Sequence, residues 1–134
     1  IVSFLESIPE EKHEFRYEAG KWTIKEVVQH IIDTERIFTY RALCIARKDK
    51  SAFPGYEQDD YVVTCNANDR TLQSLIDEYK SVRAASINLY GSFSDEMLTE
   101  IGTASNSSLS ARAVAFILIG HENHHCHVIK ERYL

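Results

Sequence analysis

The chain has 134 residues, of which 44% are hydrophobic and 26% charged, values that fit one globular domain over residues 1–134 and exclude a disordered polypeptide. Lys and Arg total 15 and Asp and Glu total 20, so the formal net charge of −5 argues against nucleic acid as a partner. The longest apolar run, Ala113–Ile119, is too short to span a bilayer, so we expect no membrane partner.

The N-terminal segment predicts a short helix. Val2, Leu5 and Ile8 share one helical face, and Pro9 ends the pattern. We interpret this segment as the tail of a truncated N-terminal helix that begins before Ile1.

The first long helix is predicted from Thr23 to about Lys48. Thr23 and Glu26 form the sequence pattern of a capping box, in which each satisfies a backbone N–H of the other. No Pro or Gly interrupts the segment, and apolar residues recur at helical spacing: Ile24, Val28, Ile31, Phe38, Ala42 and Ile45.

The middle of the chain predicts a connection and a second long helix. Residues 49–68 contain Pro54 and Gly55, which favour a long loop. A helix is expected to follow Asp69 and to end near Gly91, because apolar residues again recur on one face.

The last third of the chain predicts a capped turn, a loop and a final helix. Ser94 is a candidate cap for a turn over residues 95–97, and residues 102–107 are predicted to form a loop. The final helix is expected to begin near Ser108. With no strand predicted, the fold class is all-α, and long helices with apolar stripes favour an antiparallel four-helix bundle.

Four of the six histidines lie between residues 121 and 127. On a helical wheel His121 and His125 are about 40° apart, inside the apolar stripe of the last helix. Two inward imidazoles one turn apart form a two-ligand clamp for a divalent cation. The alternative is that both are core histidines with hydrogen-bond partners. His124 and His127 are expected at the surface.

The segment His121–His125 also matches the HExxH pattern of zinc proteases. Those enzymes need a third ligand further along the chain, and the extended pattern would require His at the position of Glu131 and Gly at the position of Val128. Glu122 also lies on the flank of the apolar stripe. We therefore treat the protease as the weaker alternative.

His30 is the candidate third ligand. It lies about two turns after the start of the first long helix, at the edge of the apolar stripe. Its depth matches that of His121 and His125 if the two helices are antiparallel neighbours. Asp33 is a candidate for orienting the His30 ring as a supporting residue. Three neutral imidazoles would leave a bound cation with an open coordination position.

The three cysteines, Cys44, Cys65 and Cys126, are an odd number without motif spacing. We expect free thiols in a reducing compartment, which indicates the cytoplasm.

Several stretches resemble the DinB-like superfamily, which includes the YfiT-like metal-dependent hydrolases. They are Gly20–His30, Asp33–Arg36, Arg41–Leu43 and Gly120–His125. The resemblance implies a four-helix bundle of the DinB/YfiT-like type with a zinc or nickel ion on His30, His121 and His125. The chain departs from many relatives at positions 127 and 128, where His and Val replace a Gly-Gln pair.

For function, the resemblance implies a metal-dependent hydrolase or an S-transferase that uses a low-molecular-weight thiol such as bacillithiol or mycothiol. It also implies a small-molecule substrate and a homodimer. Arg36, Arg41 and Arg112 are candidate contacts for the carboxylates of a thiol, unless they are ordinary surface cations. The alternative function is a non-catalytic, metal-stabilised stress-response or interaction module.

Overall fold

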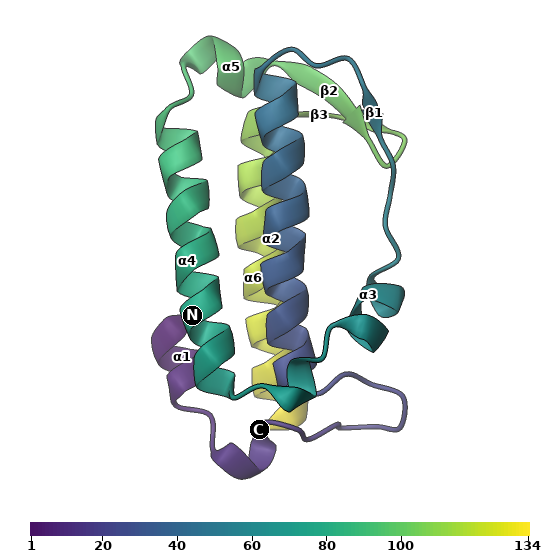
Figure 1. Cartoon of the computed structure of the whole chain (residues 1–134), viewed down its shortest axis with the longest axis vertical. Coiled ribbons are helices and arrows are strands. Elements are labelled where there is room, and N and C mark those ends of the chain that lie inside the picture. The colour runs from purple at the N-terminus through teal and green to yellow at the C-terminus, as the bar shows by residue number, and fades with distance from the viewer.

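The computed structural model describes all 134 residues. Three long helices dominate it: α2 (Ile24–Ala46), α4 (Leu72–Gly91) and α6 (Ala111–Val128), which continues into a π-helical turn at Ile129–Tyr133 (Figure 1). Helix α2 packs against both α4 and α6. The short helix α1 (Val2–Glu6) packs against the first half of α4 and completes the four-helix bundle.

The sequence predicted an antiparallel bundle, but the helices are not antiparallel throughout. Helix α6 runs opposite to α2, but α4 runs in the same direction as α2 (Figure 1). Side-chain contacts show that the two helices are parallel, because the residue numbers of both partners increase together from one contact to the next. The contacts are Gln29 with Arg70, Arg36 with Glu78, and Thr39 with Ser86. The long connection after α2 returns the chain to the end where α2 began, and this makes the parallel arrangement possible.

The predicted start of the first long helix is confirmed. The backbone N–H of Glu26 donates to Thr23 Oγ1 over 3.1 Å, and the N–H of Thr23 donates to the Glu26 carboxylate over 2.7 Å. The helix ends at Ala46, two residues before the predicted boundary. Helix α4 is capped by Thr71 and ends at Gly91 as expected.

The connection predicted for residues 49–68 contains a short helix, α3 (Gln58–Thr64), and is followed by a 3₁₀ turn at Ala67–Asp69. Asp59 and Asp60 lie in the first turn of α3, where carboxylates stabilise the exposed N–H groups, and Val62 is buried. A helix of seven residues with one buried side chain leaves too little apolar periodicity to be seen in the sequence.

A small three-stranded sheet corrects the all-α prediction. Strand β1 (Ala52–Phe53) pairs in parallel with β2 (Ile101–Ala104), which forms a hairpin with β3 (Ser107–Ser110). The predicted loop at 102–107 is therefore a hairpin. Its two turn residues, Ser105 and Asn106, have φ values of 51° and 61°, as a tight hairpin turn requires.

The hairpin also shifts the last helix. It begins at Ala111, capped by Ser110, instead of near Ser108. The capped turn predicted after Ser94 is confirmed as α5 (Asp95–Thr99).

The core is divided along the bundle axis into two clusters. The cluster near the chain termini joins α1, the first half of α2, the first half of α4 and the π-helical turn. Its fully buried members include Leu5, Ile24, Ile32, Leu75 and Ile129. The cluster at the other end lies under the sheet and is built from Ala42, Ile45, Ala46, Phe93, Ala111, Val114 and Leu118.

None of the helices combines the length and the apolar character that a membrane-spanning segment needs.

The contact between the sheet and α2 predicts the effect of two glycine substitutions. A Cβ at Gly102 would overlap the Ile45 side chain, whereas a Cβ at Gly120 in α6 would meet open space. Gly102→Ala should lower the free energy of unfolding by about 1–3 kcal/mol. Gly120→Ala should raise it by about 0.5–1 kcal/mol, because alanine favours the helix. Urea denaturation followed by circular dichroism measures both. A neutral Gly102→Ala would show that the sheet does not pack on α2.

Candidate metal centre

Three imidazoles from two antiparallel helices meet inside the bundle. His30 comes from the second turn of α2, and His121 and His125 come from consecutive turns of α6. The Nε2 atoms of His30 and His121 lie 2.9 Å apart, and those of His121 and His125 lie 3.1 Å apart. His30 is buried, with 3% of its surface exposed, and the other two are half-buried. The predicted convergence of the three rings is present.

The donor chemistry of this cluster fits a cation better than it fits mutual hydrogen bonds. Each nitrogen of a neutral imidazole either carries one hydrogen or offers one lone pair. His121 Nε2 lies within hydrogen-bond distance of two other nitrogens, so it can pair with only one of them. One divalent cation would accept lone pairs from all three rings.

The dimensions of the cluster also fit. One ligand atom from each of the three residues lies within 4.8 Å of the others. Two imidazole nitrogens on a tetrahedral zinc ion lie about 3.3 Å apart, because each Zn–N bond is about 2.0–2.1 Å long. The observed separations of 2.9 and 3.1 Å are close to this value. The three side chains could therefore hold a metal ion after a small outward adjustment.

Burial keeps the three rings in the form that a metal binds. Loss of solvation, together with the neighbouring His121, lowers the pKa of His30 to about 4. Loss of solvation and the other imidazoles lower the pKa of His125 to about 3, and burial also lowers the pKa of His121. All three rings are therefore neutral at pH 7, with lone pairs free for coordination.

Trp22 covers the cluster, a role that the sequence did not reveal. Its ring centroid lies 4.8 Å from that of His30 and 6.5 Å from that of His125. Its carbonyl accepts a hydrogen bond of 2.8 Å from the Tyr133 hydroxyl. One sequence signal could have identified this role of Trp22, namely its position directly before the helix cap Thr23. The cap fixes the direction in which the chain enters the helix, and so fixes the place of the residue before it.

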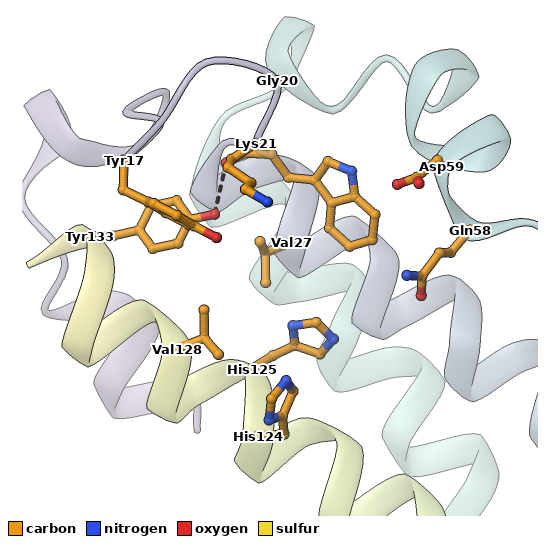
Figure 2. Close-up of a pocket in the computed structure, with 11 residues that line it drawn as sticks. Tyr17, Gly20, Lys21, Val27, Gln58, Asp59, His124, His125, Val128 and Tyr133 are labelled. Carbon is orange, nitrogen blue, oxygen red and sulfur yellow. Dashed lines mark hydrogen bonds between the residues drawn. The ribbon is translucent and has the colours of Figure 1, made fainter.

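A pocket of about 370 Å³ opens beside His125. Its walls come from the loop before α2, from α3 and from the end of α6 (Figure 2). His124, predicted at the surface, is exposed but lines this pocket, and its ring centroid lies 5.3 Å from that of His125. Helix α3 contributes Gln58 and Asp59, so a helix absent from the sequence prediction supplies one wall.

Glu122 is bound away from the imidazole cluster, which removes the protease alternative. Its carboxylate accepts a 2.6 Å hydrogen bond from the Tyr79 hydroxyl and pairs with Arg83. Arg83 also donates twice to Glu35, a side chain with 2% of its surface exposed. Glu122 therefore joins α6 to α4 and α2 and is not free to act as the general base that a zinc protease needs.

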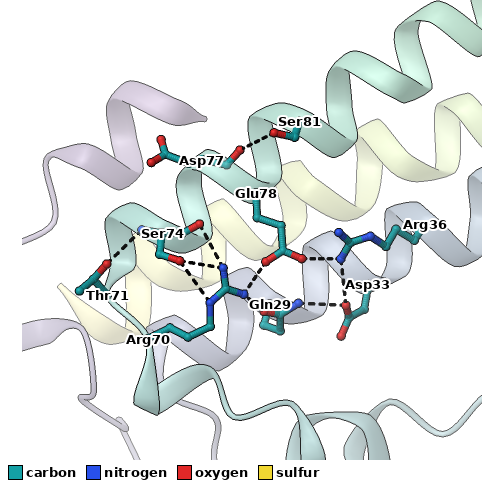
Figure 3. A network of polar contacts seen from close by, with 9 residues as sticks. All are labelled: Gln29, Asp33, Arg36, Arg70, Thr71, Ser74, Asp77, Glu78 and Ser81. Atoms are coloured by element: carbon teal, nitrogen blue, oxygen red, sulfur yellow. Dashed lines mark hydrogen bonds and ion pairs between the residues drawn. The ribbon is translucent and has the colours of Figure 1, made fainter.

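The structure corrects the orienting role predicted for Asp33. Its carboxylate accepts a hydrogen bond of 2.9 Å from Gln29 and lies 3.8 Å from Arg36, and no hydrogen bond joins it to His30 (Figure 3). Asp33 lies three residues after His30 on α2. Its side chain belongs to the face toward α4, where Arg36 and Arg70 both pair with Glu78.

The three arginines proposed as anion contacts do not line the pocket. Arg36 pairs with Glu78, and Arg41 donates to the Pro54 carbonyl over 2.6 Å. Arg112 is exposed at the start of α6. The three cysteines are free thiols, as expected.

Comparisons with known proteins agree with this architecture. Residues 1–129 match the family model of the DinB superfamily. Among solved structures, the chain is similar to YfiT from Bacillus subtilis, described as "a probable metal-dependent hydrolase with an unusual four-helix bundle topology". The TM-score is 0.76 at 13% identity, over 96% of this chain and 78% of that chain, so the likeness concerns the fold. No curated protein sequence matches.

The lowered histidine pKa values predict a pH dependence of the metal-free protein. Because the pKa of His125 is about 3 in the folded state and about 6.5 in an unfolded chain, the unfolded state binds more protons between these values. The free energy of unfolding should therefore fall as the pH is lowered below 6.5. Glutamine at position 125 cannot be protonated, so His125→Gln should weaken this dependence.

Urea denaturation between pH 4.5 and 7.5 after chelator treatment measures the effect. His127→Gln is the control, since the His127 side chain is 67% exposed. Identical pH profiles for the wild type and His125→Gln would contradict the burial argument.

Proposed function

The chain belongs to the DinB superfamily, and we propose that it is a metal-dependent enzyme whose divalent cation is bound by His30, His121 and His125. The observation that carries the proposal is the meeting of three neutral imidazoles at one point, with Nε2 separations of 2.9 and 3.1 Å. When bound, such a cation acidifies a water molecule or a thiol at its open position, and so supplies a nucleophile at neutral pH.

The residues around the cluster support chemistry on a small molecule. Trp22 packs against His30 and excludes solvent from one side of the imidazoles. The pocket beside His125, which Trp22 also lines, is open to solvent and has the size of a small-molecule site. His124 lines the same pocket and forms no hydrogen bond within the protein, so its imidazole is available for proton transfer to a substrate.

Two reactions fit this arrangement, and we place hydrolysis first. It is supported by the description of YfiT as a probable metal-dependent hydrolase, applied here by analogy of fold. Transfer of a low-molecular-weight thiol is the second, because a thiol could occupy the same open position. Zinc and nickel are the proposed ions, since both suit imidazole ligands.

Metal content tests the site directly. Protein purified without chelator should hold one divalent ion per chain by elemental analysis. His30→Ala or His121→Ala should remove one of three ligands and weaken the affinity by more than about 100-fold, the upper limit for merely supporting residues. His127→Ala removes an exposed histidine that pairs with Glu131 and should retain the ion. Wild-type protein without an ion would contradict the proposal.

Activity separates the enzyme from a non-catalytic, metal-stabilised module. We expect turnover of carboxylic esters or amides, or thiol addition to an electrophile, that is lost on chelation and restored by added Zn²⁺ or Ni²⁺. His124→Gln should lower kcat by about 10²–10³-fold while the ion content stays unchanged, if its imidazole transfers the proton. If metal only raises the melting temperature and none of these substrates is turned over, the protein is the non-catalytic module.

A further inference from the structure

The pocket beside His125 contains two opposite charges that have no partner in the protein. Lys21 and Asp59 both line it, and neither forms an ion pair or a side-chain hydrogen bond. Two nearby cations are already paired: Arg16 with Glu26 over 2.8 Å, and Lys25 with Glu14 over 2.6 Å. Lys21 and Asp59 are thus a cation and a carboxylate in the lining of this pocket that are free to contact a ligand.

The two charges come from different walls. Lys21 lies in the loop before α2, and Asp59 lies in the first turn of α3. Figure 2 shows them on either side of the pocket, with His124 and His125 below them on α6. Because the two groups do not pair with each other, a ligand that contacts both must carry its own charges at separate positions.

Both walls are held in place by the fold. The Lys21 carbonyl accepts a hydrogen bond from Arg16, and Gly20, with a φ of 79°, makes the bend that precedes it. On the other wall, the Tyr56 hydroxyl just before α3 bonds to Thr34 of α2 over 2.6 Å. A ligand would therefore meet charges whose backbones are already positioned, which reduces the entropy lost on binding.

We propose that this pocket binds a small, chain-like zwitterion, with its ammonium group at Asp59 and its carboxylate at Lys21. Dipeptides and ω-amino acids belong to this chemical class. The middle of such a molecule would pass near His125 and the aromatic side chain of Trp22, which line the same pocket. The proposal rests on the proposed function, since it assigns the substrate class of the same site.

Calorimetric titration with three probes of similar length tests the charge requirement. The probes are 6-aminohexanoate, which carries both charges, and hexylamine and hexanoate, which carry one each. They are titrated into the 134-residue chain as purified and again after chelator treatment. In both samples 6-aminohexanoate should bind at least about tenfold more tightly than either single-charge probe, the value of one charge-assisted contact.

Variants locate the two contacts. Lys21→Gln should remove the preference for 6-aminohexanoate over hexylamine, and Asp59→Asn should remove its preference over hexanoate. Lys50→Gln and Asp95→Asn are the matched controls, because both residues are exposed, form no ion pair and lie at the opposite end of the bundle. These controls should keep the preference.

The outcomes separate this inference from the proposed function. Equal affinity for the three probes, or an unchanged preference in Lys21→Gln and Asp59→Asn, overturns the inference even if the ion is bound. If the protein as purified holds no metal ion, the proposed metal-dependent function is overturned, while a preference for 6-aminohexanoate in that same protein still supports the zwitterion site.

Discussion

The antiparallel packing of α2 against α6 is the constraint on which the site depends. It sets the beginning of α2 beside the end of α6, so that His30 meets two histidines more than 90 residues away in the chain. The Thr23–Glu26 capping box fixes where α2 begins, and Glu26 is held in turn by Arg16 and Asn68. In the turn after α6, the Tyr133 hydroxyl donates to the Trp22 carbonyl and so joins the end of α6 to the loop before α2.

Polar side chains, rather than apolar ones alone, hold α4 parallel to α2. Arg70 bonds to Gln29 at one end of the pair, and Arg36 bonds to Glu78 about two turns further on (Figure 3). Arg83 pairs with the buried Glu35 and with Glu122 of α6, which ties three helices together one residue away from His121. Glu35 is buried, so removing Arg83 would leave its charge uncompensated, and this contact therefore favours one register of the helices.

The connection between α2 and α4 has a structural and a functional part. Its first part adds strand β1 to the hairpin at one end of the bundle. Its second part, α3, returns to the end where the imidazoles lie and supplies Gln58 and Asp59 to the pocket. Asn68 bonds to Glu26 and to Thr23, so the same connection supports the cap of α2. The parallel order of α2 and α4 is thus what brings α3 to the imidazole cluster.

Features that depend on residues within one helix could be predicted from the sequence alone. The three long helices, the caps of α2 at Thr23 and of α5 at Ser94, and the inward facing of His30, His121 and His125 follow from capping chemistry and from the period of the α-helix, which depend only on near neighbours. The convergence of the histidines also followed, because it needed only one antiparallel pair of helices.

Other features depended on residues far apart in the chain. The parallel direction of α4 rests on polar contacts between residues about 40 positions apart, which carry no local signal. The partners of Asp33 were left open for another reason: Gln29, His30 and Arg36 all lie about one helical turn from Asp33 on α2, so helical spacing could not choose between them. The strands and α3 are short and polar, so only tertiary packing could stabilise them and decide their structure.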